Sequence, residues 1–417
     1  MNAILRSLLG VFLVMAMVCL PCVTKVASQS ELVEYKIPIT LDFSGPYADL
    51  SRYLGFGCES TFAWWNKEYS TKLGVKLTPK PHDSRYDPAV IASLYPGIVA
   101  ELKPISWIGL GGPTVAALKG RLPYDKIAMV NISATYGFDW KSPNYIVYPR
   151  PTFPHEFAGW LDWALKNIWK EPRPMRIANV SNDKPPAYVD AEKGFKKFIS
   201  EVYPGKAEYL GSAWVDMVPV DVTEAIRPFV AKGVDYFFLM SNVPQAVATA
   251  KACTALGKHI PLVTATHLDT MFISKVLGWE KMEGFYDTGC MASALNHDIP
   301  AYKEIWLKHL PKGADPVKDW TLGTIQSVQA SIIVCRAVEK AIARVGARNL
   351  TGEAIYQSFF EPWKKGEEMG ISMGFGWTSD SPFPKEENLG AMFSTVKGGK
   401  HLLATKEYQP VPKIPKW

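Results

Sequence analysis

The sequence predicts an α/β protein made of two doubly wound parallel-sheet lobes. From Tyr35 onward, short runs rich in β-branched and aromatic residues alternate with helical patterns of roughly 12 to 18 residues, which is typical of βαβ units. The chain has 417 residues, more than one hydrophobic core usually holds. No low-complexity linker divides it. We therefore expect several chain crossings between two lobes and a hinge.

The first lobe is predicted at residues 29–149, with a returning segment at about 291–362. Its strands are expected at residues 35–43, 75–83, 105–111 and 126–132. Each is followed by a loop and most by a helix, as a parallel sheet requires.

The second lobe is predicted at residues 150–290, with the tail at about 363–417. It opens with a helix over residues 154–169, where Phe157, Trp160 and Leu161 recur at helical spacing. Its strands are expected at residues 176–182, 209–215, 236–241, 261–266 and 285–290. Helices are expected at residues 300–310, at 322–345 and from Thr351, which can serve as an N-cap. The tail from Glu361 is rich in Pro, Gly and aromatic residues and predicts loops and short strands.

The N-terminus has the three regions of a secretory signal peptide over residues 1–28. Arg6 supplies the positive charge, residues 8–20 the apolar run, and Val26-Ala27-Ser28 a small-residue cleavage site. The apolar run is short for a membrane span. Cys22 lacks the small residues that lipoprotein processing uses before the modified cysteine. We expect a free periplasmic protein, exported across the inner membrane and cleaved near Ser28.

Charge and cysteine usage argue against several function classes. Without the signal peptide, 44 basic and 40 acidic residues remain, in no long runs, which disfavours nucleic-acid binding. Four scattered cysteines also remain: Cys58, Cys253, Cys290 and Cys335. None of them form a C-x-x-C motif, so their spacing does not suggest a metal site. They form either one or two disulfides or buried free thiols. We expect no cofactor and no metal.

Catalytic signatures are missing from the sequence. It contains no G-x-S-x-G, H-E-x-x-H or Walker A motif, so we do not expect an enzyme. The run Gly109-Leu110-Gly111-Gly112 follows a strand and opens a helix, but it lacks the third glycine of a dinucleotide site. Its backbone N–H groups and the helix that starts near Thr114 can instead approach an anion.

Residues after strand ends are the natural candidates for a ligand site, because open α/β sheets bind ligands beyond the carboxyl ends of their strands. Among the histidines, His267 lies at such an end. Aromatic walls often enclose small ligands, and four tyrosines fall in loops or at helix starts that face the presumed cleft: Tyr47, Tyr53, Tyr136 and Tyr188.

Three motifs in this order resemble the type I periplasmic binding proteins of branched-chain amino acid ABC transporters. They are LDFSGPYA at residues 41–48, HDSRYDP at 82–88 and WIGLGGPT at 107–114. The resemblance implies two lobes joined by three crossings that close on one ligand. It implies a monomeric receptor that delivers an amino acid, a small organic or aromatic carboxylate, or an amide to an inner-membrane ABC permease. The same fold also serves as a ligand-sensing receptor for signalling systems, and that alternative stays open.

The resemblance also implies particular site residues. Residues 132–135 are similar to the loop after the fourth strand, where members bind the ligand with a backbone group and a hydroxyl. Residues 180–183, followed by Tyr188, resemble a second-lobe strand and its ligand-facing tyrosine, and residues 321–328 resemble the helix that returns to the first lobe. The hydroxyls of Thr114 and Thr135 suit a carboxylate, because they carry no charge that must be desolvated. The predicted ligand-binding residues are Tyr47, Tyr53, Gly112, Thr114, Ser133, Ala134, Thr135, Tyr188, Asn242, Thr266 and His267.

One position departs from the amino-acid-binding pattern. Members commonly carry a glutamate after a second-lobe strand that pairs with the ligand's ammonium, and here the nearest match is Thr266. An unpaired buried ammonium costs several kcal/mol. Either Asp269 or Asp287 substitutes for the glutamate, or the ligand has no ammonium, which we slightly favour.

Overall fold

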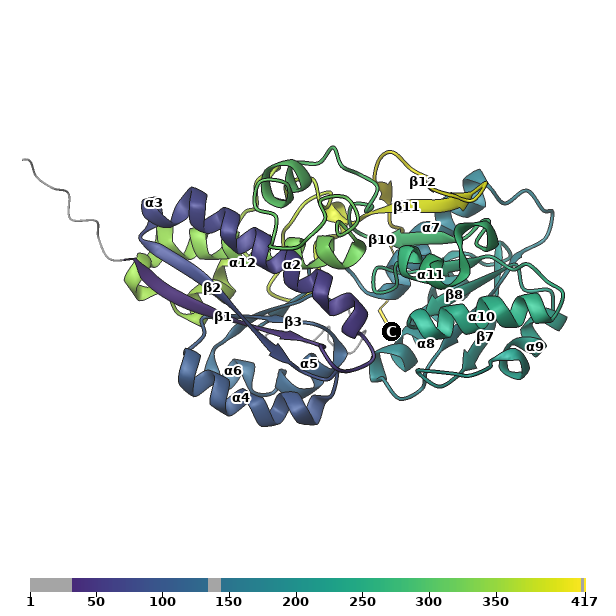
Figure 1. Cartoon of the computed structure of the whole chain (residues 1–417), viewed down its shortest axis with the longest axis horizontal. Coiled ribbons are helices and arrows are strands. Elements are labelled where there is room, and N and C mark those ends of the chain that lie inside the picture. The colour runs from purple at the N-terminus through teal and green to yellow at the C-terminus, as the bar shows by residue number, and fades with distance from the viewer. Residues whose placement is uncertain (1–31, 134–143, 414–415) are drawn as a thin grey trace, which may run out of the picture. The chain divides into compact units, whose positions relative to one another are not determined.

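The computed structural model describes residues 32–133, 144–413 and 416–417 (Figure 1). The predicted signal peptide and its cleavage site lie outside these residues, as do Ala134, Thr135 and Tyr136. Within the described part of the chain, no helix combines the length and the apolar character that a membrane span requires.

The first sheet is parallel throughout and has the strand order β2-β1-β3-β4-β5. Its strands are β1 (Val33–Leu41), β2 (Val75–Asp83), β3 (Ser106–Gly109), β4 (Ala128–Asn131) and β5 (Ile146–Val147). The four predicted strands are present, and β2 has the predicted bounds. The pattern did not indicate β5, because two residues are too few to show a period.

Helices cover both faces of this sheet (Figure 1). One face carries α2 (Ala48–Trp65) and α12 (Leu322–Val345), and the other carries α4 (Pro88–Leu102), α5 (Gly112–Leu118) and α6 (Leu122–Asp125). Helices α2 and α12 pack closely at Gly57, where a Cβ atom would lie 2.1 Å from Ser327 Oγ and 2.4 Å from the Thr324 carbonyl oxygen. Only glycine fits this crossing.

The second sheet has the order β12-β11-β10-β9-β8-β6-β7, with β13 paired to β11. The parallel strands are β6 (Met175–Ser181), β7 (Ala207–Trp214), β8 (Tyr236–Met240), β9 (Leu262–Thr264) and β10 (Tyr286–Gly289). The tail adds β11 (Gly390–Lys397), β12 (Lys400–Leu403) and β13 (Gln409–Pro410), and β11 runs antiparallel to β10. The second sheet is therefore mixed rather than wholly parallel.

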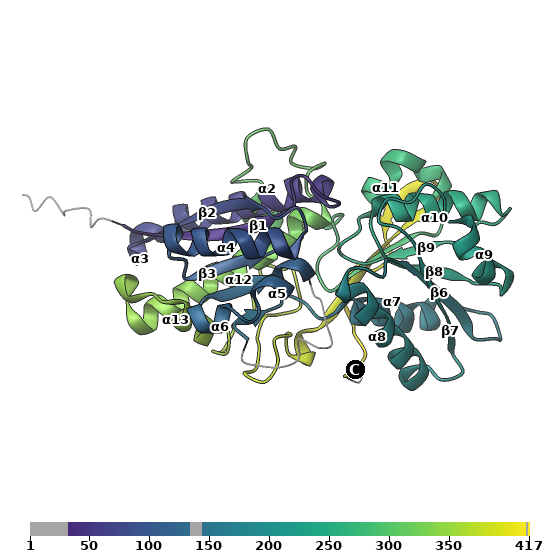
Figure 2. The same cartoon turned by 90° about the horizontal axis from the view of Figure 1, so that it is seen from below.

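Helices also flank the second sheet on both faces (Figure 2). One face carries α7 (Phe153–Asn167) and α8 (Pro186–Val202), and the other carries α9 (Thr223–Ala231), α10 (Val243–Ala255) and α11 (Thr270–Leu277). Both lobes thus have the predicted doubly wound architecture.

The remaining helical segments are short. They are α3 (Thr71–Leu73), α13 (Gly352–Ser358) and the turns Asn66–Ser70, Trp279–Lys281, Ala301–Trp306, Ala347–Asn349 and Glu386–Asn388. Thr351 caps α13 as predicted, since its hydroxyl accepts a hydrogen bond from the Ala354 N–H at 3.1 Å. The helix expected at residues 300–310 is reduced to Ala301–Trp306.

The chain passes between the two sheets three times. It leaves the first sheet after β5 and builds β6 to β10 in the second. It then returns to pack α12 and α13 against the first sheet, and the tail strands go back to the second. This connectivity agrees with the predicted three-crossing hinge. The four cysteines of the described chain are buried free thiols.

Candidate functional site

Tyr47 is held in place by the loop that follows β1. The buried Asp42 accepts hydrogen bonds from the N–H groups of Gly45 at 2.6 Å and Tyr47 at 2.8 Å. A Cβ atom at Gly45 would lie 2.5 Å from Asp42 Oδ1 and 2.7 Å from the Arg85 carbonyl oxygen, so glycine is required there. The Ser-Gly-Pro turn thus directs Tyr47 beyond the carboxyl end of β1.

Tyr188 and His267 occupy equivalent places on the second sheet. Helix α8 begins at Pro186, where proline's missing N–H costs nothing, and Tyr188 lies in its first turn, after β6. His267 lies in the turn after β9 that the Leu268 N–H closes on the Ala265 carbonyl at 2.9 Å. Both side chains are buried.

These residues line a small pocket beyond the carboxyl ends of strands from both sheets. The free volume is about 20 Å³, roughly the room one water molecule needs. Its lining consists of Tyr47, Leu50, Tyr86, Leu110, Gly112, Ser133, Phe153, Ala187, Tyr188, His267 and Gln326. Among the described residues, no aspartate, glutamate, lysine or arginine belongs to this lining.

Aromatic side chains from the two lobes close the pocket. The hydroxyls of Tyr47 and Tyr188 are hydrogen bonded to each other. The Tyr86 ring lies 4.5 Å from the Tyr47 ring, and Phe153 meets His267 edge to face at 4.6 Å, measured between ring centroids. Such a surface suits a small, largely apolar ligand.

His267 lines this pocket and has unused hydrogen-bonding capacity within the described residues. Neither ring nitrogen makes a hydrogen bond within the described chain. The nearby Ser241 backbone acts to raise the pKa of His267, but two larger effects oppose it. Burial, and then the charge of Arg150, lower the pKa of His267 to about 3. The imidazole is therefore neutral at physiological pH and can donate or accept.

A buried ion pair lies directly behind the pocket wall. Arg150 Nε is 3.4 Å from Glu156 Oε1, and both side chains are fully buried. Arg150 Nη2 donates to Gln326 Oε1 at 3.1 Å, and Gln326 Nε2 donates to the Thr266 carbonyl at 2.5 Å. Burial raises the pKa of Glu156, while Arg150 and the donors of Thr266 oppose the rise. This network joins α7, the turn after β9 and α12.

The structure brings together five of the predicted ligand-binding residues: Tyr47, Gly112, Ser133, Tyr188 and His267. It places four elsewhere. Tyr53 packs against Phe272 with ring centroids 5.2 Å apart, and the Thr114 hydroxyl lies 3.2 Å from that of Thr40. Asn242 caps α10 through the Gln245 N–H at 3.1 Å.

Thr266 is the fourth predicted residue outside the pocket lining. Its N–H and hydroxyl both donate to Glu156, at 3.1 and 2.9 Å. Its polar groups are thus committed to the buried network. Ala134 and Thr135 lie outside the described residues, so their predicted roles stay predictions.

Neither acid considered as a partner for an ammonium belongs to the aromatic pocket. Asp269 accepts from the N–H groups of Met271 and Leu322, at 2.8 and 3.0 Å. Asp287 accepts from Thr270 and Ser394 and lies 3.0 Å from His401 Nε2. Both acids line a separate small cavity beside His401.

Tyr86, Phe153 and Gln326 also line the pocket, and they were not predicted from the sequence. Tyr86 lies in the motif at residues 82–88 and Gln326 in the segment 321–328, both already noted for the resemblance. The signal for Tyr86 is its position shortly after the end of β2. Phe153 and Gln326 reach the pocket from helices, and no local pattern marks them.

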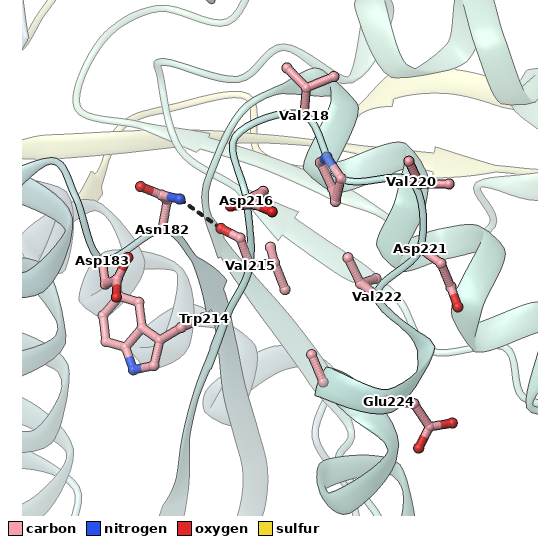
Figure 3. A pocket seen from close by; sticks show the side chains of 12 residues that line it. Asn182, Asp183, Trp214, Val215, Asp216, Val218, Val220, Asp221, Val222 and Glu224 are labelled. Atoms are coloured by element: carbon pink, nitrogen blue, oxygen red, sulfur yellow. Dashed lines mark hydrogen bonds between the residues drawn. The ribbon is translucent and has the colours of Figure 1, made fainter.

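A second, larger hollow lies at the edge of the second sheet (Figure 3). It has a volume of about 770 Å³ and is lined after β6 and β7 by residues that include Asp183, Trp214, Asp216, Asp221 and Glu224. The Asn182 amide donates to the Val215 carbonyl at 2.7 Å at its rim. This groove is wide open and acidic, and it contains none of the predicted ligand-binding residues.

Two doubly wound lobes, three crossings and a closed pocket beyond the strand ends define a two-lobed ligand-binding protein. The chain belongs to the periplasmic binding protein family, whose profile matches residues 34–376. A comparison with curated protein sequences finds no match.

Solved structures share the fold at low sequence identity. A branched-chain amino acid ABC transporter protein from Thermus thermophilus with bound valine is 18% identical, with 92% of this chain and 97% of that chain covered and a TM-score of 0.76. A solute-binding protein of an ABC transporter from Rhodopseudomonas palustris HaA2, in complex with p-hydroxybenzoic acid, is 17% identical, with coverages of 92% and 98% and a TM-score of 0.71. A leucine-binding protein from Thermotoga maritima MSB8 is 16% identical, with coverages of 89% and 98% and a TM-score of 0.70.

Proposed function

We propose that this chain is the extracytoplasmic substrate-binding protein of an ABC transporter, which traps one small solute between its two lobes for uptake. The contact between Tyr47 of the first lobe and Tyr188 of the second carries this proposal. Because the two side chains come from different lobes, a ligand between them would hold the lobes closed, and hinge closure is how periplasmic receptors capture ligands. The lobes are residues 29–149 with about 291–362, and residues 150–290 with about 363–417.

The solute is proposed to lack an ammonium group. The pocket lining offers aromatic rings, hydroxyls and a neutral imidazole, whereas a buried ammonium needs a carboxylate partner. Asp269 and Asp287 are committed elsewhere. The solved relatives include complexes with valine and with p-hydroxybenzoic acid, and this pocket favours a ligand of the second kind, an organic or aromatic acid, over an amino acid.

The receptor works in the periplasm as a free monomer and passes its ligand to an inner-membrane permease. N-terminal sequencing of exported protein tests this localisation. A mature chain that starts near Gln29 supports it, and a lipid on Cys22 contradicts it.

A thermal-shift screen of organic acids, amides and amino acids tests the binding function. A ligand present at 100 times its dissociation constant stabilises the folded state by roughly 2.7 kcal/mol, so a true ligand raises the melting temperature clearly. Recovery of the compound unchanged supports a receptor, whereas conversion to a product would indicate an enzyme. Loss of uptake in a strain without this chain supports transport, and loss of a response with uptake intact would favour a sensor.

A further inference from the structure

The guanidinium of Arg150 has hydrogen-bond donors that no described residue uses. Its Nη1 has no hydrogen-bond partner in the described chain, and neither has its Nε, which makes only the ion-pair contact with Glu156. Arg150 is 1% exposed, so water does not solvate these donors freely. Buried polar groups are nearly always paired, and one that is not requires an explanation.

Arg150 lies against the wall of the aromatic pocket. Its guanidinium carbon is 5.9 Å from the centre of the Phe153 ring, and its Nη2 binds Gln326. Its charge is near enough to lower the pKa of His267. Phe153, Gln326 and His267 all line the pocket, so Arg150 lies directly behind the wall that they form.

Glu156 does not accept a hydrogen bond from these donors of Arg150. Its carboxylate already accepts from the Thr266 N–H and hydroxyl, and its ion-pair contact with Arg150 is at Nε, 3.4 Å from Oε1. The Nη1 group is therefore available to another acceptor. A carboxylate is the best match, because the charge-assisted hydrogen bonds that a guanidinium donates to a carboxylate are strong and often bidentate.

We infer that Arg150, assisted by His267, binds the acidic group of the ligand, and that the ligand is a small organic anion without an ammonium whose apolar body contacts Tyr47, Tyr86 and Tyr188. This assignment rests on the proposed function. It differs from the hydroxyl set expected from the sequence, because Thr114 is bonded to Thr40 instead. Entry of such a ligand must separate the hydroxyls of Tyr47 and Tyr188, since the present free volume is about 20 Å³.

Matched sets of probes distinguish an anion site from a general apolar pocket. Benzoate, phenylacetate and 3-methylbutanoate are compared with their primary amides and with the corresponding amines, together with L-valine and L-phenylalanine, by thermal shift and calorimetry on the mature chain. The inference predicts that acids bind, and that each acid binds about tenfold or more tighter than its amide.

Variants then assign the preference to Arg150. Arg150→Lys keeps the positive charge beside Glu156 but loses the planar pair of donors. The double variant Arg150→Gln/Glu156→Gln removes both buried charges together and so leaves neither unpaired. Both variants should reduce the ratio of acid to amide affinity, and the double variant should bring it close to one. The matched control is Arg336→Gln/Glu339→Gln, which removes a partly buried pair (2.9 Å) on α12 and should leave the ratio unchanged.

The outcomes separate this inference from the proposed function. An acid preference that survives in both Arg150 variants would overturn the assignment, and so would tight binding of amines, amides or amino acids instead of acids. In either case the protein would remain a solute receptor. A protein that no compound of any class stabilises would count against the receptor function itself.

Discussion

The hydroxyl of Tyr47, placed by the loop after β1, is hydrogen bonded to the hydroxyl of Tyr188, in the first turn of α8. The two residues are 141 positions apart, and each follows a strand of a different sheet. Burial raises the pKa of Tyr188, so its phenol stays neutral at physiological pH. It marks the place where the lobes meet and where we expect the ligand to lie.

Tyr188→Phe should weaken ligand binding without unfolding the protein. The ring and its packing remain, but one buried hydroxyl is lost, which costs about 0.5–1.5 kcal/mol in affinity if the hydroxyl contacts the ligand. Calorimetry with the strongest acid found in the screen measures the change. Tyr203→Phe is the control, because its hydroxyl donates to the Ala158 carbonyl at 3.1 Å within the second lobe. Equal affinity loss in both variants would argue against a ligand contact at Tyr188.

Gly57→Ala should destabilise the first lobe. The added methyl would lie 2.1 Å from Ser327 Oγ and against the backbone of α12, and overpacking of this kind costs about 1–3 kcal/mol. Urea denaturation measures the change in the free energy of unfolding.

Gly97→Ala is the matched control for that helix substitution. Gly97 lies in α4, and a Cβ atom there meets nothing within 4 Å. The change should stabilise the protein by about 0.5–1 kcal/mol, because alanine loses less backbone entropy in a helix. A Gly57→Ala protein as stable as the wild type would show that α2 and α12 are farther apart than described.

The effect of His401→Gln should depend on pH. Burial opposes protonation of His401, but the hydrogen bond to Asp287 and the charges of Asp287 and Asp269 outweigh it and raise the pKa above its ordinary value of 6.5. The folded state therefore holds this proton more tightly than the unfolded state. The stabilisation is fully present below pH 6.5 and is lost as the pH rises through the folded-state pKa.

The measurement compares melting temperatures of the variant and the wild type across this range. The loss of stability caused by His401→Gln should be largest near pH 5.5 and smaller near pH 8.5. The difference between the two losses should be roughly the free energy that corresponds to the pKa shift. Lys400→Gln, at an exposed neighbour on β12, should show no such trend. A His401→Gln deficit that grows with pH would contradict the ion pair with Asp287.

Much of the fold could be predicted from the sequence. In a parallel α/β lobe the strands are buried and the helices pack on them with one face, so strand and helix patterns alternate along the chain. The predicted bounds of β2 and α12 agree with the structure. The tail was expected to add short strands to the second lobe, but the antiparallel pairing of β11 with β10 could not be predicted, since it is a long-range property. The predicted boundaries of the lobes remain a prediction.

The site was less predictable, because local hydrogen bonds decide which polar groups are free. Thr266 and Asn242 follow strand ends as expected. However, the Thr266 hydroxyl is hydrogen bonded to Glu156, and the Asn242 side chain caps α10. Tyr47, Tyr188 and His267 were found because residues after strand ends of both lobes meet at one place. Phe153 and Gln326 could be found only after the helices were packed.

A crystal structure of the mature chain with the strongest ligand of the screen tests the central claim most directly. The account predicts one ligand per chain between Tyr47 and Tyr188, with their hydroxyls separated and an acidic group within hydrogen-bonding distance of Arg150 Nη1 or His267. A ligand bound in the acidic groove beside Asp183 and Trp214, with the two tyrosine hydroxyls still in contact, would contradict it.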